Sequence, residues 1–241
     1  MLKGVAKALA SAGLTVLVFT GLTNCGGKAD GGSTDGKCPP QTSPALNCSN
    51  GASPANPVIT TFTTDEGWCT SSGKWGTTGN LVGSVFSYKG TATGTMVNHN
   101  VVGGALHLTG DVMVADYAGG GLAFDACVNT STYSGVQFVM GGNAAGCSVQ
   151  FQLQTYSQQA SENRGGCVQD AGSCYQFPKF SLPASGGEIT VRWTDLESTG
   201  MPATARQIAA EIVGLQFQLQ ADTGVACTAF DLTFDDVKFI P

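Results

Sequence analysis

Two short stretches decide the fold: residues 148–154 read Ser-Val-Gln-Phe-Gln-Leu-Gln, and residues 215–220 read Leu-Gln-Phe-Gln-Leu-Gln. Successive side chains of a β-strand point to opposite faces of its sheet, so this alternation predicts strands with one buried and one exposed face. Further alternating stretches lie at 105–109, 136–139, 189–193 and 230–240. Repeated half-buried strands are typical of antiparallel sheets, and we predict an all-β antiparallel sandwich over residues 58–241.

The composition agrees with this class and excludes others. The chain has 241 residues, of which 34 are glycine, and only 12% are charged. Glycine at this level disfavours a helical bundle, and the absence of a Gly-x-y period excludes collagen. The net charge of −6 argues against a nucleic-acid partner, because phosphates require basic surfaces.

The N-terminus has the pattern of an export signal. A short basic head, 1–7, precedes an uncharged stretch over 8–22 that is too short for a membrane span. Its end, Leu-Thr-Asn-Cys at 22–25, resembles a bacterial lipobox, in which Cys25 is acylated and becomes the mature N-terminus. The interpretation is a lipoprotein signal peptide over 1–24, with an outer-membrane or cell-surface location. The alternative is an ordinary signal peptide that leaves Cys25 free.

Residues 25–57 are rich in glycine, serine and proline and carry almost no large apolar side chain. Such a segment has nothing to bury, so we predict a flexible tether. If Cys25 is acylated, the only membrane contact is through this lipid anchor.

The cysteine count supports an oxidising compartment. Nine cysteines leave one unpaired, and acylation of Cys25 removes the odd one. The sequence has no C-x-x-C motif of the kind that binds zinc. We predict four disulfides, with short-loop pairs Cys38–Cys48 and Cys167–Cys174. The remaining four pair in one of three ways; they are Cys69, Cys127, Cys147 and Cys227.

Several motifs resemble, in order, the galactose-binding-like jelly rolls of bacterial carbohydrate-binding modules. Residues 125–138 resemble their D-x-S-x-Y-x-G-[IV]-x-F strand entry, and 104–110 their G-x-A-L-H-x-x-G strand. The cysteine-bounded loop 167–177 is similar to the one that precedes their W-x-x-apolar strand, found here around Trp193. Residues 62–67 and 234–239 resemble their opening F-E-D-G and closing I-D-D-[IV]-x-F. The departure is at 139–141, where the usual aromatic residue is missing.

The resemblance implies a structural calcium ion that joins the first and last strands. Calcium prefers about 6–8 oxygen ligands. Asp65 and Glu66 open the first strand of the resembling fold, and Asp235 and Asp236 lie in the last. Adjacent strand residues point to opposite faces, so only one of Asp235 and Asp236 can be a ligand, and the resemblance favours Asp236. The alternative is that these carboxylates are solvated strand-end charges.

The outward residues of the strands are mainly neutral amides, which offer donors and acceptors to sugar hydroxyls. If the strands share one sheet, these residues form a ligand face with loop aromatics Trp68, Trp75, Tyr88, Tyr117, Tyr156 and Tyr175 at its rim. The alternative is a plain polar surface. The predicted ligand residues are His107, Gln137, Gln150, Gln152, Gln154, Arg192, Gln216 and Gln218.

Catalytic motifs are absent from the sequence. The chain has no paired-carboxylate pattern of a glycosidase, no G-x-S-x-G and only two histidines. We therefore expect no enzyme, but a surface-anchored module that binds a neutral oligosaccharide or polysaccharide. The alternative function is a structural or adhesion lipoprotein with the same sandwich and no sugar ligand.

Overall fold

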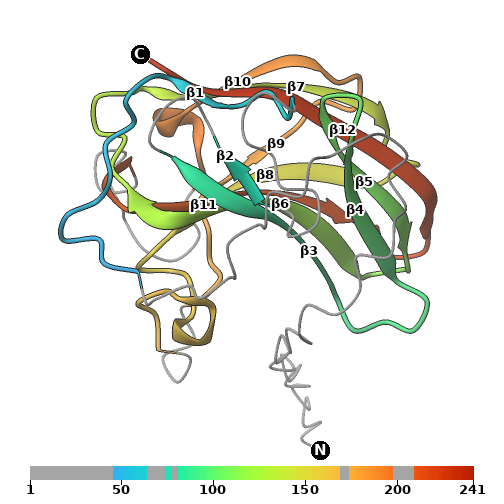
Figure 1. Cartoon of the computed structure of the whole chain (residues 1–241). Coiled ribbons are helices and arrows are strands. Elements are labelled where there is room, and N and C mark those ends of the chain that lie inside the picture. The colour runs from blue at the N-terminus through green and yellow to red at the C-terminus, as the bar shows by residue number, and fades with distance from the viewer. Residues whose placement is uncertain (1–45, 64–73, 77–80, 169–173, 198–208) are drawn as a thin grey trace, which may run out of the picture.

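The computed structural model describes residues 46–63, 74–76, 81–168, 174–197 and 209–241. In these residues the chain forms two six-stranded sheets that face each other (Figure 1). The first, sheet A, has the order β2-β3-β6-β11-β8-β9. Its strands are β2 (Lys74–Gly76), β3 (Val82–Lys89), β6 (Tyr117–Val128), β8 (Ser148–Thr155), β9 (Lys179–Ser181) and β11 (Ile212–Gln220).

The second, sheet B, has the order β10-β7-β12-β5-β4, and β1 pairs with β12 off this path. Every paired strand is antiparallel. The predicted all-β antiparallel sandwich of the jelly-roll class is therefore confirmed. The strands of sheet B are β1 (Val58–Thr60), β4 (Met96–Val102), β5 (Ala105–Val112), β7 (Gly135–Asn143), β10 (Gly187–Arg192) and β12 (Cys227–Ile240).

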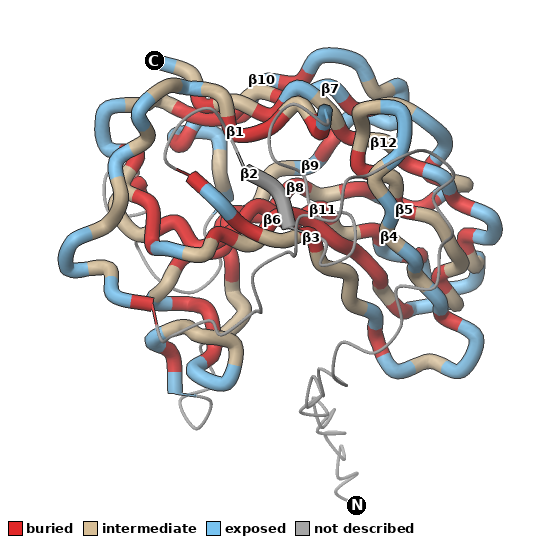
Figure 2. The backbone as a smooth tube through the Cα atoms, in the orientation of Figure 1, coloured by how far each residue is buried: buried red, intermediate tan, exposed pale blue. Residues whose placement is uncertain are grey.

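The core lies between the two sheets, where the inward halves of the alternating stretches meet (Figure 2). Phe217 of β11 stacks on Phe234 of β12 with ring centroids 3.7 Å apart, and Phe138 of β7 meets Phe217 edge-on at 5.1 Å. Such aromatic pairs stabilise beyond their buried area by about 0.5–1.5 kcal/mol each. Alternation in the sequence thus supplies both inner layers of the sandwich.

Residues 46–57 are attached to the sandwich, although the sequence assigns them to the tether. Leu46 is buried, Cys48 is bonded to Cys127 of β6, and the backbone N–H of Ala52 donates to the Cys127 carbonyl at 2.7 Å. The disulfide, the buried leucine and the packing of Ala52 against the core hold this segment on the sandwich. The part of the predicted tether and signal peptide before residue 46 lies outside the described residues.

Three disulfides are present in the described residues. Cys167–Cys174 is confirmed, and Cys147–Cys227 joins the start of β8 to the start of β12, and so sheet A to sheet B. The predicted pair Cys38–Cys48 is wrong, because Cys48 bonds to Cys127 instead. Short spacing favoured the local pair, whereas the fold brings β6 beside residue 48. Cys38 and Cys69 lie outside the described residues.

Within the described part of the chain, no helix is long and apolar enough to span a membrane.

Candidate functional site

The glutamine rows of β8 and β11 lie side by side on the outer face of sheet A. Gln216 is the cross-strand partner of Gln152, and Gln218 is the partner of Gln150. Directly opposed side chains on one face of an antiparallel pair lie close enough to interact. The two alternating stretches that define the fold thus also assemble the amide face.

On the other side of β11, strand β6 presents glycines to this face. Gly121 pairs with Gln216 and Gly119 with Gln218, so neither glutamine has a side chain beside it on β6. A Cβ atom at Gly119 would lie 2.5 Å from the hydroxyl oxygen of Tyr88, whose ring occupies this space. The glycines therefore form a floor that lets Tyr88 of β3 reach across β6 toward the glutamines.

A pocket of about 160 Å³ opens on this face. Its floor and one side come from β3, β6, β8 and β11, and the loop between β8 and β9 forms another side. Among the described residues, no acidic, basic or histidine side chain lines the pocket. The lining residues are Tyr88, Tyr117, Gln152, Gln154, Gln159, Tyr175, Phe177, Gln216 and Gln218.

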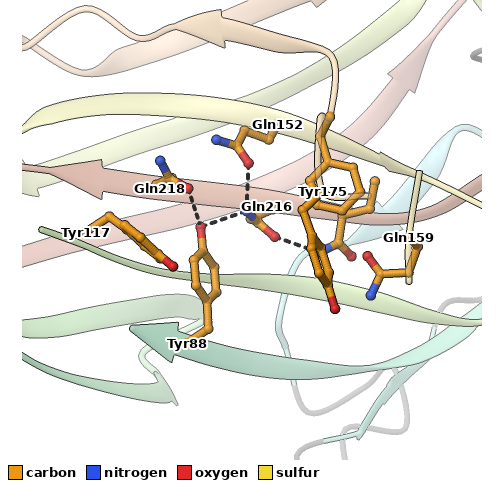
Figure 3. A pocket seen from close by; sticks show the side chains of 9 residues that line it. Tyr88, Tyr117, Gln152, Gln159, Tyr175, Gln216 and Gln218 are labelled. Carbon is orange, nitrogen blue, oxygen red and sulfur yellow. Dashed lines mark hydrogen bonds between the residues drawn. The ribbon is translucent and has the colours of Figure 1, made fainter. Parts of the chain in front are cut away.

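Gln216 is the centre of a hydrogen-bond network in this pocket (Figure 3). Its Nε2 donates to Gln152 Oε1 and to the Tyr88 hydroxyl, each at 2.7 Å, and its Oε1 accepts from Gln154 Nε2 at 2.6 Å. The Tyr88 hydroxyl donates in turn to Gln218 Oε1 at 3.2 Å. The NH₂ groups of Gln152 and Gln218 are left without a partner among the described residues.

The direction of this network is reversible. A glutamine amide can turn over in place and exchange its oxygen for its NH₂ group. Turning over all four amides and the Tyr88 hydroxyl together keeps every hydrogen bond of the network and reverses each donor and acceptor. Gln152 and Gln218 then present oxygens instead of NH₂ groups. The pocket thus suits ligands whose groups both donate and accept, as hydroxyl groups do.

Two tyrosines of the pocket, Tyr88 and Tyr117, keep their protons near neutral pH. Burial raises the pKa of Tyr88 well above its usual value, and Tyr117 beside it raises that pKa further, while the hydrogen bond from Gln216 acts in the opposite direction. Burial and the nearby Asp116 also raise the pKa of Tyr117. Both phenols therefore act as neutral hydroxyl groups near neutral pH.

The predicted single ligand face divides between the two sheets. Gln150, Gln152, Gln154, Gln216 and Gln218 share the outer face of sheet A. Three of them, Gln152, Gln154 and Gln216, are buried there and not exposed as the alternation predicts, because they hydrogen-bond to one another and to Tyr88 in the pocket. The expectation of one common face is wrong for three residues, because alternation shows which side of a strand is exposed but not to which sheet the strand belongs. These three lie on β5, β7 and β10 of sheet B and are His107, Gln137 and Arg192.

Contacts of two of these residues also lie within sheet B. His107 Nδ1 is 3.5 Å from the Asp231 carboxylate, and Gln137 Nε2 donates to Thr190 Oγ1 at 3.0 Å. They belong to the polar outer surface of that sheet.

The predicted aromatic rim is present in part. Tyr88, Tyr117 and Tyr175 line the pocket, although Tyr88 lies within a strand and not in a loop. Tyr156 packs against a separate small apolar cluster, and Trp75 lies in β2. Trp68 lies outside the described residues.

Two lining residues, Gln159 and Phe177, were not expected from the sequence. Both belong to the loop between β8 and β9, where no alternation marks the direction of a side chain. The motif resemblance covered the later part of this loop but gave neither residue a role.

The predicted calcium ligands remain a prediction. Asp236 lies at an irregularity of β12 beside β1, with a φ of 50°, and its N–H donates to Asp235 Oδ1 at 2.6 Å. Asp65 and Glu66 lie outside the described residues. The described part of the chain holds no group of three or more His, Cys, Asp or Glu side chains suited to a metal ion.

Comparisons with known proteins give similarities of structure only. No family model matches the sequence, and no curated protein matches it. A family 11 carbohydrate-binding module from a cellulosomal cellulase of Clostridium thermocellum is similar, with a TM-score of 0.45 and 13% identity, over 65% of this chain and 86% of that one.

Two further structures are similar over the same share of this chain. The Clostridium thermocellum family 11 module in complex with a β-1,3-1,4-mixed-linked tetrasaccharide has a TM-score of 0.43 at 11% identity and is covered to 88%. A family 29 carbohydrate-binding module has a TM-score of 0.30 at 10% identity and is covered to 91%.

Proposed function

We propose that the pocket on sheet A binds a neutral oligosaccharide or polysaccharide. The observation that carries this proposal is the amide network, in which Gln216 and Tyr88 hold Gln152 and Gln218 in place while their outer groups stay free. Hydrogen-bonding groups that are preorganised by the protein lose little conformational entropy when a ligand binds. Sugar hydroxyls both donate and accept, and so they match the network in either direction.

The rest of the lining fits the same ligand class. Three tyrosine rings and Phe177 supply flat apolar surface beside the amides, a combination typical of small-molecule sites. A phosphate or carboxylate ligand would find no cation among the lining residues to balance its charge. We expect a modest affinity of about −4 to −8 kcal/mol, because hydrogen bonds that replace water contribute only about 1 kcal/mol each.

The proposed function is binding without catalysis. Glycoside hydrolysis commonly needs two carboxylates about 5–10 Å apart across the scissile bond. No aspartate or glutamate is among the described residues that line this pocket. We therefore propose a module that holds a glycan and leaves it intact. A reducing-sugar assay on any glycan that binds tests this point, and release of sugar would contradict it.

We further propose that the module is exported and anchored to the outer membrane or cell surface through acylated Cys25. The support is the basic head, the apolar stretch and the Leu-Thr-Asn-Cys sequence at 22–25. Such an anchor would place the pocket where extracellular polysaccharides are found.

The test is a glycan array on the purified protein, followed by calorimetry on the strongest neutral ligand. Gln152→Ala and Gln218→Ala should each weaken binding by about three- to tenfold, since each removes a hydrogen bond of about 1 kcal/mol. Gln137→Ala is the matched control, because it removes the same group from sheet B. It should leave the affinity unchanged.

If no neutral glycan binds, or if both pocket variants bind as tightly as the parent, the proposal fails. Absence of any neutral glycan ligand would favour the alternative, a structural or adhesion lipoprotein without a sugar ligand. Unchanged binding by both variants would place the glycan site elsewhere.

A further inference from the structure

One buried polar atom of a pocket-lining residue has no hydrogen-bond partner among the described residues. Gln159 is 7% exposed, and its Oε1 is buried without a hydrogen bond among the described residues. Its Nε2 donates only a long hydrogen bond of 3.4 Å to the Asn163 carbonyl. A buried acceptor left unpaired destabilises the fold, and native proteins keep few of them. Because this oxygen belongs to a residue that lines the pocket, a ligand is its natural partner.

Gln159 lies at a closed end of the pocket. The loop that follows β8 brings Gln159, Tyr175 and Phe177 to the end of the glutamine rows nearest Gln154. Figure 3 shows Gln159 and Tyr175 at this end and Tyr117 at the opposite end. Gln154, Gln159 and Phe177 are buried at the loop end and Tyr175 is half-buried, whereas both residues at the opposite end, Tyr117 and Gln218, are half-buried. The pocket is thus blocked by the loop and open toward Tyr117.

Hydrogen bonds and a disulfide hold the described residues of the loop in place. The Tyr175 N–H donates to the Gln158 carbonyl at 2.7 Å, and the Cys167 N–H donates to the Gln159 carbonyl at 3.0 Å. Cys167 is bonded to Cys174, and the Arg164 guanidinium donates to the Asp125 carbonyl of β6 at 2.9 Å. A wall held by these contacts does not move aside to let a continuous chain pass.

We infer that the pocket receives the end of a glycan chain, with a hydroxyl group of the terminal ring donating to Gln159 Oε1. This inference rests on the proposed function and adds which part of the glycan is recognised. The rest of the chain leaves past Tyr117, where the pocket is open. A terminal ring whose hydroxyl is methylated has no proton to donate, so it leaves Gln159 Oε1 unpaired and binds more weakly.

Chain length and end modification test the inference on the full-length protein. The probes are linear neutral oligosaccharides of glucose, galactose, mannose and xylose with one to six rings, measured by calorimetry. We expect the affinity in the series that binds to change little beyond about two rings, since a pocket of about 160 Å³ is smaller than the ~300–1,000 Å³ of sites that enclose larger ligands. The reducing end is modified by reduction and the non-reducing end by O-methylation. Modification of the end that enters the pocket should weaken binding about tenfold, and modification of the other end should leave the affinity unchanged.

Other outcomes separate the two claims. An affinity that rises with each added ring, unaffected by either end modification, overturns chain-end recognition and leaves sugar binding intact. No binding by any series overturns both.

A pair of variants tests the role of Gln159 itself. Gln159→Met keeps the length of the side chain and removes the unpaired oxygen, so it should weaken binding about tenfold and leave the melting temperature unchanged or higher. Gln158→Met is the control, because Gln158 is also buried but its Oε1 accepts from Thr155 Oγ1 at 3.0 Å. The control should lower the melting temperature and leave binding unchanged. If Gln159→Met binds as tightly as the parent, the assigned hydrogen bond is wrong.

Discussion

At the scale of single residues, Gln216 and Tyr88 hold the pocket together. Gln216 uses both of its N–H groups and its oxygen inside the network, so it orients its neighbours more than it offers free groups to a ligand. Tyr88 links it to Gln218. Loss of the Tyr88 hydroxyl would leave two glutamines with unpaired groups in a half-buried site.

Tyr88→Phe should therefore reduce both stability and binding. We expect a loss of about 1 kcal/mol in the free energy of unfolding, measured by urea denaturation, and an affinity about three- to tenfold weaker by calorimetry. Tyr133→Phe is the control, since Tyr133 packs against Phe239 of sheet B, away from the pocket. Equal effects of the two substitutions would contradict the network.

Binding should not depend on pH near neutrality. The described residues that line the pocket include no acidic, basic or histidine side chain, and burial raises the pKa of Tyr88 and of Tyr117 above the usual tyrosine value. Calorimetry across this range should give one affinity. A change centred near pH 6–7 would mean that a histidine or carboxylate contributes.

The same raised pKa values affect stability at high pH. A tyrosine pKa that is higher in the folded state favours folding below the unfolded value of about 10 and loses this contribution as pH rises further. Stability should therefore fall above about pH 10, and less so in Tyr88→Phe.

At the scale of elements, the loop after β8 contributes more to the site than its sequence indicates. Gln159, Tyr175 and Phe177 all come from this loop, which is closed by Cys167–Cys174. Residues 46–57 are instead fastened to the far end of β6 by Cys48–Cys127. The two disulfides should therefore affect different properties.

Replacing each pair by serine separates these roles. The Cys48–Cys127 bond joins residues 79 apart and should contribute about 4–5 kcal/mol in the chain-entropy model, against about 2–3 kcal/mol for Cys167–Cys174, whose residues are 7 apart. Urea denaturation should show the larger loss in the free energy of unfolding for the double variant Cys48→Ser with Cys127→Ser. Calorimetry should show the larger loss of binding for Cys167→Ser with Cys174→Ser. The reverse order of binding losses would contradict the role of the loop.

The sequence predicts the strands well and their arrangement less well. Alternation is a local signal, and it identified the buried faces of β8 and β11 and the amides opposite them. It could not show that His107, Gln137 and Arg192 lie on sheet B, because sheet membership depends on pairings between distant segments. The same limit applies to cysteines: the short loop of Cys167–Cys174 was predictable, whereas Cys48–Cys127 depends on the fold.

At the scale of the whole molecule, the proposed lipid anchor at the N-terminus determines where we expect the protein. Cys25→Ser should move the protein from the membrane fraction to the soluble fraction of the cells that produce it, because it removes the thiol that we propose is acylated. Fractionation and immunoblotting measure this. A variant that stays in the membrane fraction would contradict the lipid anchor.

A calcium ion that uses Asp236 with Asp65 or Glu66 would also act on the whole molecule, by joining the first and last strands. An ion that binds only the folded state stabilises it by about 2.7 kcal/mol at a hundredfold excess over Kd. Chelator should thus lower the melting temperature of the parent and leave that of Asp236→Ala unchanged. Identical melting curves of the parent with and without chelator would remove calcium from the account.

The most direct test of the central claim is to observe where a sugar binds. Nitrogen-15 NMR of the protein, titrated with the neutral oligosaccharide that binds most strongly on a glycan array, follows the side-chain amides individually. We predict that the signals of Gln152, Gln216 and Gln218 shift along one saturating curve while that of Gln137 stays in place. If these three signals do not shift, or if the shifts fall on sheet B, the pocket on sheet A is not the glycan site.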